Sequence, residues 1–314
     1  MSKNDKVLFT GLKPTGRPHL GNYFGSLKPF VDNHKNYKSI IMVADYHAFI
    51  GLQDSEKLRR YTLEVVRDYL ALGLNPNEVI IFKQSDNPHH TELGWIFNCL
   101  VTMPFLQQAH AYKDAIAKGK EITAGLFTYP ILQAADIALY EADVVPVGED
   151  QHQHLEYTRD VIRKFNRLFS CDLKIPATLT MEGFGTLVGT DGRKMSKSYN
   201  NTIPLFTDSE TLKKAVMSIV TDSEGKHPAN VYAIHSLFKP ESELKPIYKK
   251  HQGRYGELKK MLLSDLEEFL TPFWEARSKI TDKDVESLLN DGAKKSINIS
   301  NQTLQKIKSA IGVV

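Results

Sequence analysis

The sequence predicts an α/β protein in which helices cover both faces of a parallel sheet and an all-helical part follows. The first observation is that short apolar runs alternate with amphipathic runs through the first half of the chain. Strands joined through helices in this order pair in parallel through right-handed crossovers. The second is that apolar residues recur at helical spacing from about residue 202 onwards. Parallel sheets bind ligands beyond the carboxyl ends of their strands, so a site is expected in the turns found there.

The strands and the first helices follow from local patterns. A helix is expected to begin near Gly21 and to end before Pro29. Asp54 predicts the N-cap of a second helix, which Gly73 and Pro76 end. Four apolar segments predict buried strands: residues 7–10, 39–44, 79–82 and 144–147.

The second half of the chain changes character after the segment 199–204, which has the composition of a hinge or linker. Thr207 and Glu210 have the spacing of a capping box, so a helix is expected to open there. Pro272 predicts a kink in a later helix. The apolar face of that helix is predicted from Leu258, Leu262, Leu266, Phe269 and Phe273.

Composition sets broad limits on the protein. The chain has 314 residues, enough for one large domain or two. Its 40 basic and 37 acidic residues give a net charge of +3, which neither requires nor excludes a nucleic-acid partner. Cys99 and Cys171 form no CxxC pair, so two reduced thiols are expected rather than a metal site or a disulfide. Without a signal-type segment or a run of membrane-spanning length, we expect a cytoplasmic protein.

The segment Asp191–Ser198 contains the string KMSKS. Two lysines three residues apart, spaced by small hydroxyl side chains on a loop with a glycine, suit a mobile clamp on a polyphosphate. A solvated basic loop is the alternative for this string taken alone.

The segment Gly11–Asn22 follows the first predicted strand and is rich in glycine and proline. Its backbone can approach a phosphate closely, and the helix that opens after it presents free N–H groups to an anion. His19 can donate a hydrogen bond to a phosphoryl oxygen. A tight turn with an exposed histidine is the alternative.

Asp136 lies in the apolar run Pro130–Tyr140. A carboxylate is costly to bury unless it is hydrogen-bonded, so the residue is either functional or part of an N-cap or a structural salt bridge. Gln133 lies one helical turn earlier and can offer a similar polar group.

Taken together, these motifs resemble those of class I aminoacyl-tRNA synthetases, in which a HIGH element pairs with KMSKS. Here the first element is Pro18-His19-Leu20-Gly21-Asn22, with Asn22 in place of the second histidine. The block Thr128-Tyr129-Pro130, Ala134-Ala135-Asp136 and Pro146 to Gln151 narrows the resemblance to tryptophanyl-tRNA synthetases of the bacterial type. The likeness runs from about Leu8 to beyond Ser198 and is weaker in the helical part.

The resemblance implies a nucleotide site. His19, Lys194 and Lys197 are implied to be catalytic and to supply charge to the leaving pyrophosphate. Asp150 is implied to accept the ribose hydroxyls, and Gly148 to let the base lie close to the backbone. Family members often carry Gln where this chain has Lys13. The implied ATP-binding residues are Lys13, Pro14, Thr15, Gly21, Asn22, Lys113, Gly148, Glu149, Asp150, Lys194, Met195, Ser196, Lys197 and Ser198.

The resemblance also implies a tryptophan pocket. Asp136 is implied to accept the indole N–H, or to share this role with Gln133. A buried acceptor left unpaired penalises every ring that lacks an N–H group. The implied pocket residues are Phe9, His47, Tyr129, Gln133, Asp136 and Gln151.

The implied fold is a Rossmann-like catalytic domain over residues 1–201 and a helical anticodon-binding domain over residues 202–314. The implied reaction activates L-tryptophan with ATP and transfers it to tRNA(Trp), with Mg²⁺ arriving on the nucleotide and no dedicated metal site on the protein. A homodimer is expected, without membrane association. Two cysteines are too few for the iron–sulfur cluster of some relatives. The rival interpretations are a tyrosyl-tRNA synthetase, a paralogue that does not aminoacylate, and a plain nucleotidylyltransferase.

Overall fold

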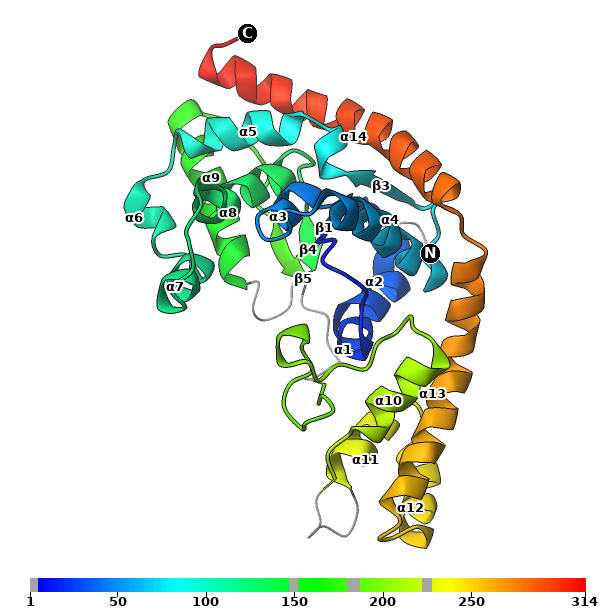
Figure 1. Cartoon of the computed structure of the whole chain (residues 1–314). Coiled ribbons are helices and arrows are strands. Elements are labelled where there is room, and N and C mark those ends of the chain that lie inside the picture. Colours follow the sequence, from blue (N-terminus) through cyan, green and yellow to red (C-terminus); the bar gives the residue numbers. More distant parts are fainter. Residues whose placement is uncertain (1–4, 147–151, 180–186, 222–227) are drawn as a thin grey trace.

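A computed structural model describes residues 5–146, 152–179, 187–221 and 228–314 (Figure 1). Within these residues, five parallel strands form one sheet in the order β3-β2-β1-β4-β5. The sheet and its crossovers confirm the predicted fold class. The strands are β1 (Val7–Leu12), β2 (Lys38–Val43), β3 (Val79–Lys83), β4 (Val144–Pro146) and β5 (Ala177–Leu179).

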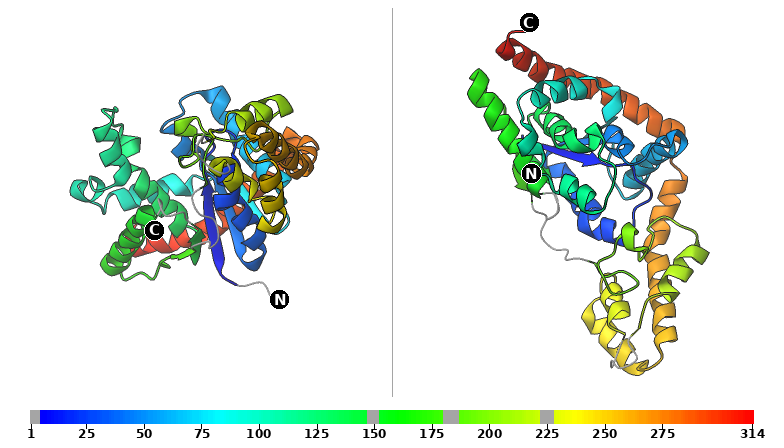
Figure 2. Two further views of the ribbon diagram at one scale, coloured as in Figure 1. Left: turned by 90° about the horizontal axis from the view of Figure 1, so that it is seen from below. Right: turned by 60° about the vertical axis from the view of Figure 1, so that its left-hand side comes forward.

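Helices connect the strands and cover both faces of the sheet (Figures 1 and 2). The helical segments before β4 are α1 (Leu20–Asn22), the π-helix η1 (Tyr23–Leu27), α2 (Lys28–Asn33), η2 (His34–Asn36), α3 (Asp45–Phe49), α4 (Ser55–Ala71), η3 (Gln84–Asp86), α5 (His89–Asn98), α6 (Met103–Leu106), α7 (His110–Ala117) and α8 (Ala124–Ala138). Those after β4 are α9 (His152–Phe169), η5 (Lys197–Tyr199), α10 (Ser209–Met217), α11 (Ala229–His235), α12 (Glu241–Lys250), α13 (Tyr255–Ser278) and α14 (Asp282–Ile311).

Alternate residues of the strands enter two separate cores. Ile41 and Ile81 belong to the cluster that continues into α1, α2, α4 and the helices α10 to α13. Ile40, Met42 and Phe82 point to the other face and pack with α5, α8 and α9. This alternation follows from the two-residue period of a strand, and burial on both faces explains why these strands are apolar throughout.

Several predicted elements are confirmed, and some boundaries differ. Asp54 caps α4 by accepting a hydrogen bond from the backbone N–H of Lys57, as predicted. The first helix does not end before Pro29. It continues to Asn33 because Pro29 lies in the first turn of α2, where a proline needs no N–H group to donate.

In the helical part, Asp208 rather than Thr207 caps α10. Its side chain accepts from the N–H of Thr211 at 2.7 Å, so the predicted capping box was placed one residue too early. Helix α13 runs without a break through Pro272. Within the part of the chain that the structure describes, no helix is long and apolar enough to cross a membrane.

The last helix, α14, returns to the sheet and lies along β3, the strand at its edge (Figure 1). An exposed edge strand invites pairing with other chains, and a covering helix prevents this. The approach is close at Gly292, where an added Cβ atom would lie 1.7 Å from the carbonyl oxygen of Ile81. The predicted division at residue 201 stays a prediction, but in space part of the segment 202–314 lies on the sheet.

We expect Gly292→Ala to lower the free energy of unfolding by about 2–3 kcal/mol, because backbone atoms of β3 leave no room for the methyl group. Gly256→Ala is the matched control, since a Cβ atom on this glycine of α13 would meet nothing within 4 Å. Alanine there should be neutral or stabilising by a few tenths to about 1 kcal/mol. Urea denaturation measures the free energy of unfolding of each variant. Equal values for the two variants would contradict the close approach of α14 to β3.

Candidate active site

The turn after β1 is organised by His19, which caps α1. Its Nδ1 atom accepts a hydrogen bond from the backbone N–H of Asn22 at 3.3 Å. The Asn22 side chain accepts in return from the N–H of His19 at 3.2 Å. Gly21 makes room for the ring, since a Cβ atom there would lie 2.9 Å from it. The asparagine that replaces the second histidine of the HIGH pattern therefore has a structural role in fixing the first.

His19 is neutral at pH 7, because burial and the nearby Lys197 ammonium lower its pKa to about 4. Its Nδ1 atom accepts a hydrogen bond, so the ring proton lies on Nε2. The expectation that His19 supplies positive charge is therefore wrong. The side chain can still donate a hydrogen bond through Nε2.

The KMSKS loop lies directly on this turn. The Lys197 Nζ atom donates to the carbonyl oxygens of Thr15 and Gly16, at 3.3 and 3.1 Å. The buried Met195 places its sulfur 3.3 Å from the backbone nitrogen of Gly21, which donates to it. Burial lowers the pKa of Lys197. Two motifs separated by more than 170 residues thus form one site, as expected from the sequence.

The segment after the loop, predicted as a hinge or linker, is also fastened to the turn. The carbonyl oxygen of Ile203 accepts from the N–H of Leu20, and the N–H of Leu205 donates to the carbonyl of Pro18. These bonds tie the segment after the KMSKS loop to the turn and the start of α1.

A second polar cluster surrounds Asp136 in the last turn of α8, where only 1% of this side chain is exposed. The Oδ2 atom accepts from His47 Nε2 at 2.8 Å, and Oδ1 accepts from His90 Nδ1 at 2.7 Å. Gln84 Nε2 donates to both oxygens, at 2.9 and 3.1 Å. Asp136 is therefore not an N-cap, and its burial is compensated by three donors.

The Asp136 carboxyl is ionised at neutral pH. Burial acts to raise its pKa, but the hydrogen bonds from His47 and His90 outweigh burial and bring the pKa to about 2. A carboxylate offers about four lone-pair directions, and the four contacts from His47, His90 and Gln84 occupy them. Because one Gln84 nitrogen serves both oxygens, a ligand N–H group can take over one of its two contacts without displacing a histidine.

Aromatic side chains surround the carboxylate. Phe9 on β1 is buried and stacks on Tyr140, with ring centroids 5.2 Å apart. The His47 and Tyr129 rings meet edge to face at 6.2 Å, and Tyr129 is hydrogen-bonded to His154 on α9. The structure thus gathers the predicted residues Phe9, His47, Tyr129 and Asp136 near the carboxyl ends of β1 and β2, and it adds His90 and Gln84.

Comparisons with known proteins show which family the chain belongs to. The family described as tRNA synthetases class I (W and Y) matches residues 1–274. The chain belongs to this family. It is 42% identical to the tryptophan–tRNA ligase of Fusobacterium nucleatum, over 98% of each chain. It is 37% identical to that of Rhodopirellula baltica, over 98% of this chain and 99% of the other.

Solved structures give the same result. The crystal structure of tryptophanyl-tRNA synthetase from Campylobacter jejuni, complexed with ADP and tryptophan, superposes with a TM-score of 0.92. It is 37% identical in sequence, and the match covers 98% of this chain and 99% of that one. The Rossmann-like fold expected from the resemblance is therefore confirmed.

Asn201 is a site residue of this synthetase that sequence reasoning missed. It is 1% exposed, and its Oδ1 atom accepts from the N–H of Ser196 at 2.8 Å. Its Nδ2 atom donates to the Asp191 carboxylate at 2.6 Å and to the Lys194 carbonyl at 3.0 Å. One buried amide thus holds the KMSKS loop from inside. Its place three residues after the motif was the signal available in the sequence.

The remaining predicted nucleotide-site residues lie around the same turn and loop. Lys13 and Thr15 are on the turn, with Pro14 buried between them, and burial lowers the pKa of Lys13. Lys194 is exposed, and the Ser198 hydroxyl lies 2.8 Å from that of Ser196.

Some predicted residues are not tied to the site by these contacts. Lys113 is exposed on α7, and in the described part of the chain no hydrogen bond or ion pair joins it to the turn or loop. Gln133 is half-buried on α8, one turn before Asp136. Gly148, Glu149, Asp150 and Gln151 lie outside the described residues.

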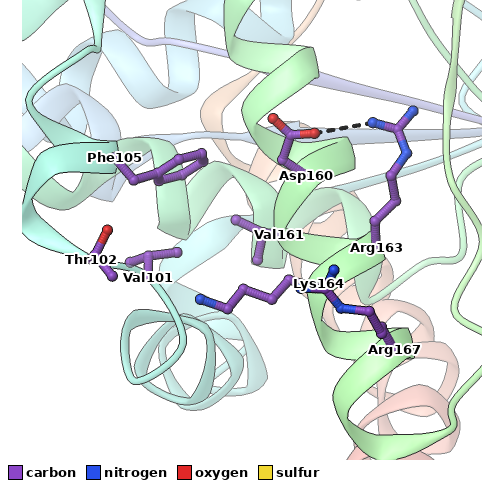
Figure 3. A pocket seen from close by; sticks show the side chains of 8 residues that line it. All are labelled: Val101, Thr102, Phe105, Asp160, Val161, Arg163, Lys164 and Arg167. Carbon is purple, nitrogen blue, oxygen red and sulfur yellow. Dashed lines mark hydrogen bonds and ion pairs between the residues drawn. The ribbon is translucent and has the colours of Figure 1, made fainter.

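Two surface hollows lie apart from the turn and loop. One, of about 430 Å³, lies between α9 and the stretch from Val101 to Phe105 at the start of α6, where the Lys164 side chain points toward Val101 and Thr102 (Figure 3). The other, of about 480 Å³, is lined by residues of α3, α4, η3, α14 and the end of β3. Among the described residues, no group of three or more His, Cys, Asp or Glu side chains is arranged to hold a metal ion.

We expect Asn201→Ala to reduce kcat/KM for ATP in pyrophosphate exchange by about tenfold, because it leaves the Ser196 N–H and the Lys194 carbonyl unpaired at a cost of roughly 1–3 kcal/mol. The dissociation constant of tryptophan should not change, since the Asp136 cluster is separate. Asn200→Gly is the control, because Asn200 has a left-handed backbone (φ 51°) that glycine adopts readily. An equal loss of kcat/KM in the two variants would argue against the role of Asn201 in holding the loop.

Proposed function

We propose that this chain is a tryptophan–tRNA ligase that acts through the two clusters described above. The tryptophan carboxylate attacks the α-phosphorus of ATP, and pyrophosphate leaves. The terminal ribose hydroxyl of tRNA(Trp) then attacks the mixed anhydride, and AMP leaves. The carboxylate is already a nucleophile, so catalysis depends on positioning and on charge placed near the leaving group.

The observation that carries the proposal is the Asp136 carboxylate, a buried and ionised acceptor with aromatic side chains near it. An indole N–H donates to it in place of one of the two Gln84 contacts, and Phe9 and Tyr129 supply aromatic surface for the ring. A site built around a buried acceptor rejects ligands that leave it unpaired. The named tryptophan–tRNA ligases that match over nearly the whole chain support tryptophan as the ring.

The nucleotide side of the proposal assigns three different roles. His19 donates a neutral hydrogen bond to a phosphate oxygen through Nε2. Lys194 and Lys197 supply positive charge to the pyrophosphate, and Lys197 exchanges the Thr15 and Gly16 carbonyls for phosphate oxygens. The remaining predicted ATP-binding residues, Lys113 and Gly148 to Asp150 among them, are proposed from the family resemblance. So is Gln151 in the tryptophan pocket.

The other partners also stay proposals. Mg²⁺ is proposed to arrive bound to ATP, where it would neutralise phosphate charge, and the described protein residues offer it no separate site. A homodimer, a cytoplasmic location and an anticodon-binding role for residues 202–314 are proposed from the family resemblance.

Pyrophosphate exchange tests the proposed function directly. With ATP present, we expect exchange that depends on tryptophan, and none above background when tyrosine replaces it. Exchange with tyrosine alone would mean that the pocket around Asp136 reads a phenol. Absence of exchange with either amino acid would indicate a paralogue that does not form adenylates.

We expect Lys197→Ala to slow adenylate formation by roughly 100-fold or more, because it removes a charge that contacts the leaving group. Tryptophan binding, measured by calorimetry, should remain nearly unchanged. Lys213→Ala, which removes an exposed lysine of α10, is the matched control and should keep the wild-type rate. A rate within about threefold of wild type for Lys197→Ala would remove this lysine from the mechanism.

A further inference from the structure

A chain of hydrogen bonds leads away from the indole-reading carboxylate into the core. His90 donates to Asp136 through Nδ1, and its Nε2 atom lies 2.8 Å from the Tyr140 hydroxyl. Asn87 Nδ2 lies 3.1 Å from the same hydroxyl. His90 and Asn87 are fully buried, and Tyr140 is 2% exposed. The proposed mechanism does not use Asn87, Tyr140 or His90.

The hydrogen bonds that lead from Asn87 to Asp136 run in one direction. The Asn87 side-chain oxygen accepts from the N–H of His89 at 3.1 Å, so its Nδ2 group faces Tyr140. The ionised Asp136 can only accept, so His90 Nδ1 carries a proton. In the neutral ring Nε2 is then an acceptor, and it receives the Tyr140 hydroxyl proton. His90 is thereby set to donate to Asp136.

The far end of the chain is held by the C-terminal helix. Asn87 Nδ2 donates to the Ser300 hydroxyl at 2.9 Å and lies 3.4 Å from that of Ser296. Both serines are fully buried, one turn apart on α14. Gly292, one turn earlier on the same face, is where α14 approaches β3. The close approach therefore brings the two hydroxyls within reach of Asn87.

We propose that α14 positions the indole-reading carboxylate through Asn87, Tyr140 and His90, which makes these three residues positioning residues for amino-acid selection. This inference deepens the proposed function and rests on it. His90 holds one oxygen of Asp136 and His47 holds the other, so together they fix the rotation of the carboxylate. Without the phenol proton, the other tautomer of His90 becomes available, and its Nδ1 lone pair would face the carboxylate.

A purely structural role makes a different prediction. If the chain only satisfied buried polar groups, its loss would weaken the binding of every ligand of the pocket to the same degree. If it orients the acceptor, its loss weakens only those ligands that donate to Asp136. The tryptophan analogue in which sulfur replaces the indole N–H has nearly the same shape and no donor. Comparing the two ligands separates the two roles.

The test is Tyr140→Phe, which keeps the ring stacked on Phe9 and removes the hydroxyl. We expect the dissociation constant of tryptophan, measured by calorimetry, to rise about threefold to tenfold, as for the loss of one hydrogen bond. That of the sulfur analogue should stay within about twofold. The double variant Ser296→Ala, Ser300→Ala should raise the dissociation constant of tryptophan relative to that of the sulfur analogue by a smaller factor. It replaces Tyr140→Phe in the test if that variant does not fold.

Tyr248→Phe is a matched control, because a second series of hydrogen bonds, in the helical part, also links a tyrosine, a histidine and an aspartate. There the Tyr248 hydroxyl lies 3.1 Å from His235 Nδ1, and His235 Nε2 lies 2.6 Å from Asp265. Its loss should leave both dissociation constants unchanged.

Two results would overturn the inference. The first is that Tyr140→Phe changes neither dissociation constant, or raises both by the same factor, while the protein still exchanges pyrophosphate with tryptophan. This result would reject the positioning role alone. If the wild-type protein neither binds nor activates tryptophan, the proposed function fails and the inference fails with it.

Discussion

The site depends on a charge that is buried in an apolar helix and must be compensated there. Asp136 has almost no contact with solvent, and an unpaired carboxylate at this position would cost several kcal/mol. Its three donors come from α3, η3 and α5, the segments that follow β2 and β3. The carboxylate thus draws the ends of two strands toward α8. The pocket that we propose to read a ring N–H is held by the same bonds that allow the fold to bury the charge.

The C-terminal helix is part of this arrangement although it is the last element of the chain. Covering the edge strand β3 requires close packing, and Gly292 permits it. Ser296 and Ser300, which lie one turn apart on α14, then face Asn87 rather than solvent. Edge protection and site geometry are therefore served by one helix face. Because α14 packs on the sheet, part of the segment 202–314 lies against the strands, while the division at residue 201 stays a prediction.

Local sequence patterns predicted the elements whose residues interact with near neighbours. The apolar strands and the Asp54 cap belong to this group, whereas the pairing of the two distant motifs was expected from the family resemblance. The predictions failed, or missed a residue, where its role depends on contacts with residues far away in the sequence. Burial in the assembled site makes His19 neutral, and nothing in its immediate sequence indicates that burial. Gln84, His90 and Asn201 are common polar residues whose roles follow only from the carboxylate or loop that tertiary folding brings to them. Two neighbouring residues, Thr207 and Asp208, can both cap a helix, and a pattern does not choose between them.

The electrostatics of the two clusters differ in a way that suits the order of the chemistry. On the amino-acid side the charge is fully paired before any ligand arrives, so a ligand must match an existing direction. On the nucleotide side His19 is uncharged and Lys197 is partly desolvated, and within the described part of the chain its hydrogen-bond acceptors are two backbone carbonyls. A polyphosphate offers this lysine a stronger, charged partner than a carbonyl does. In the proposed function, the nucleotide itself would therefore favour closure of the loop on ATP, while the core would fix the selection of the amino acid.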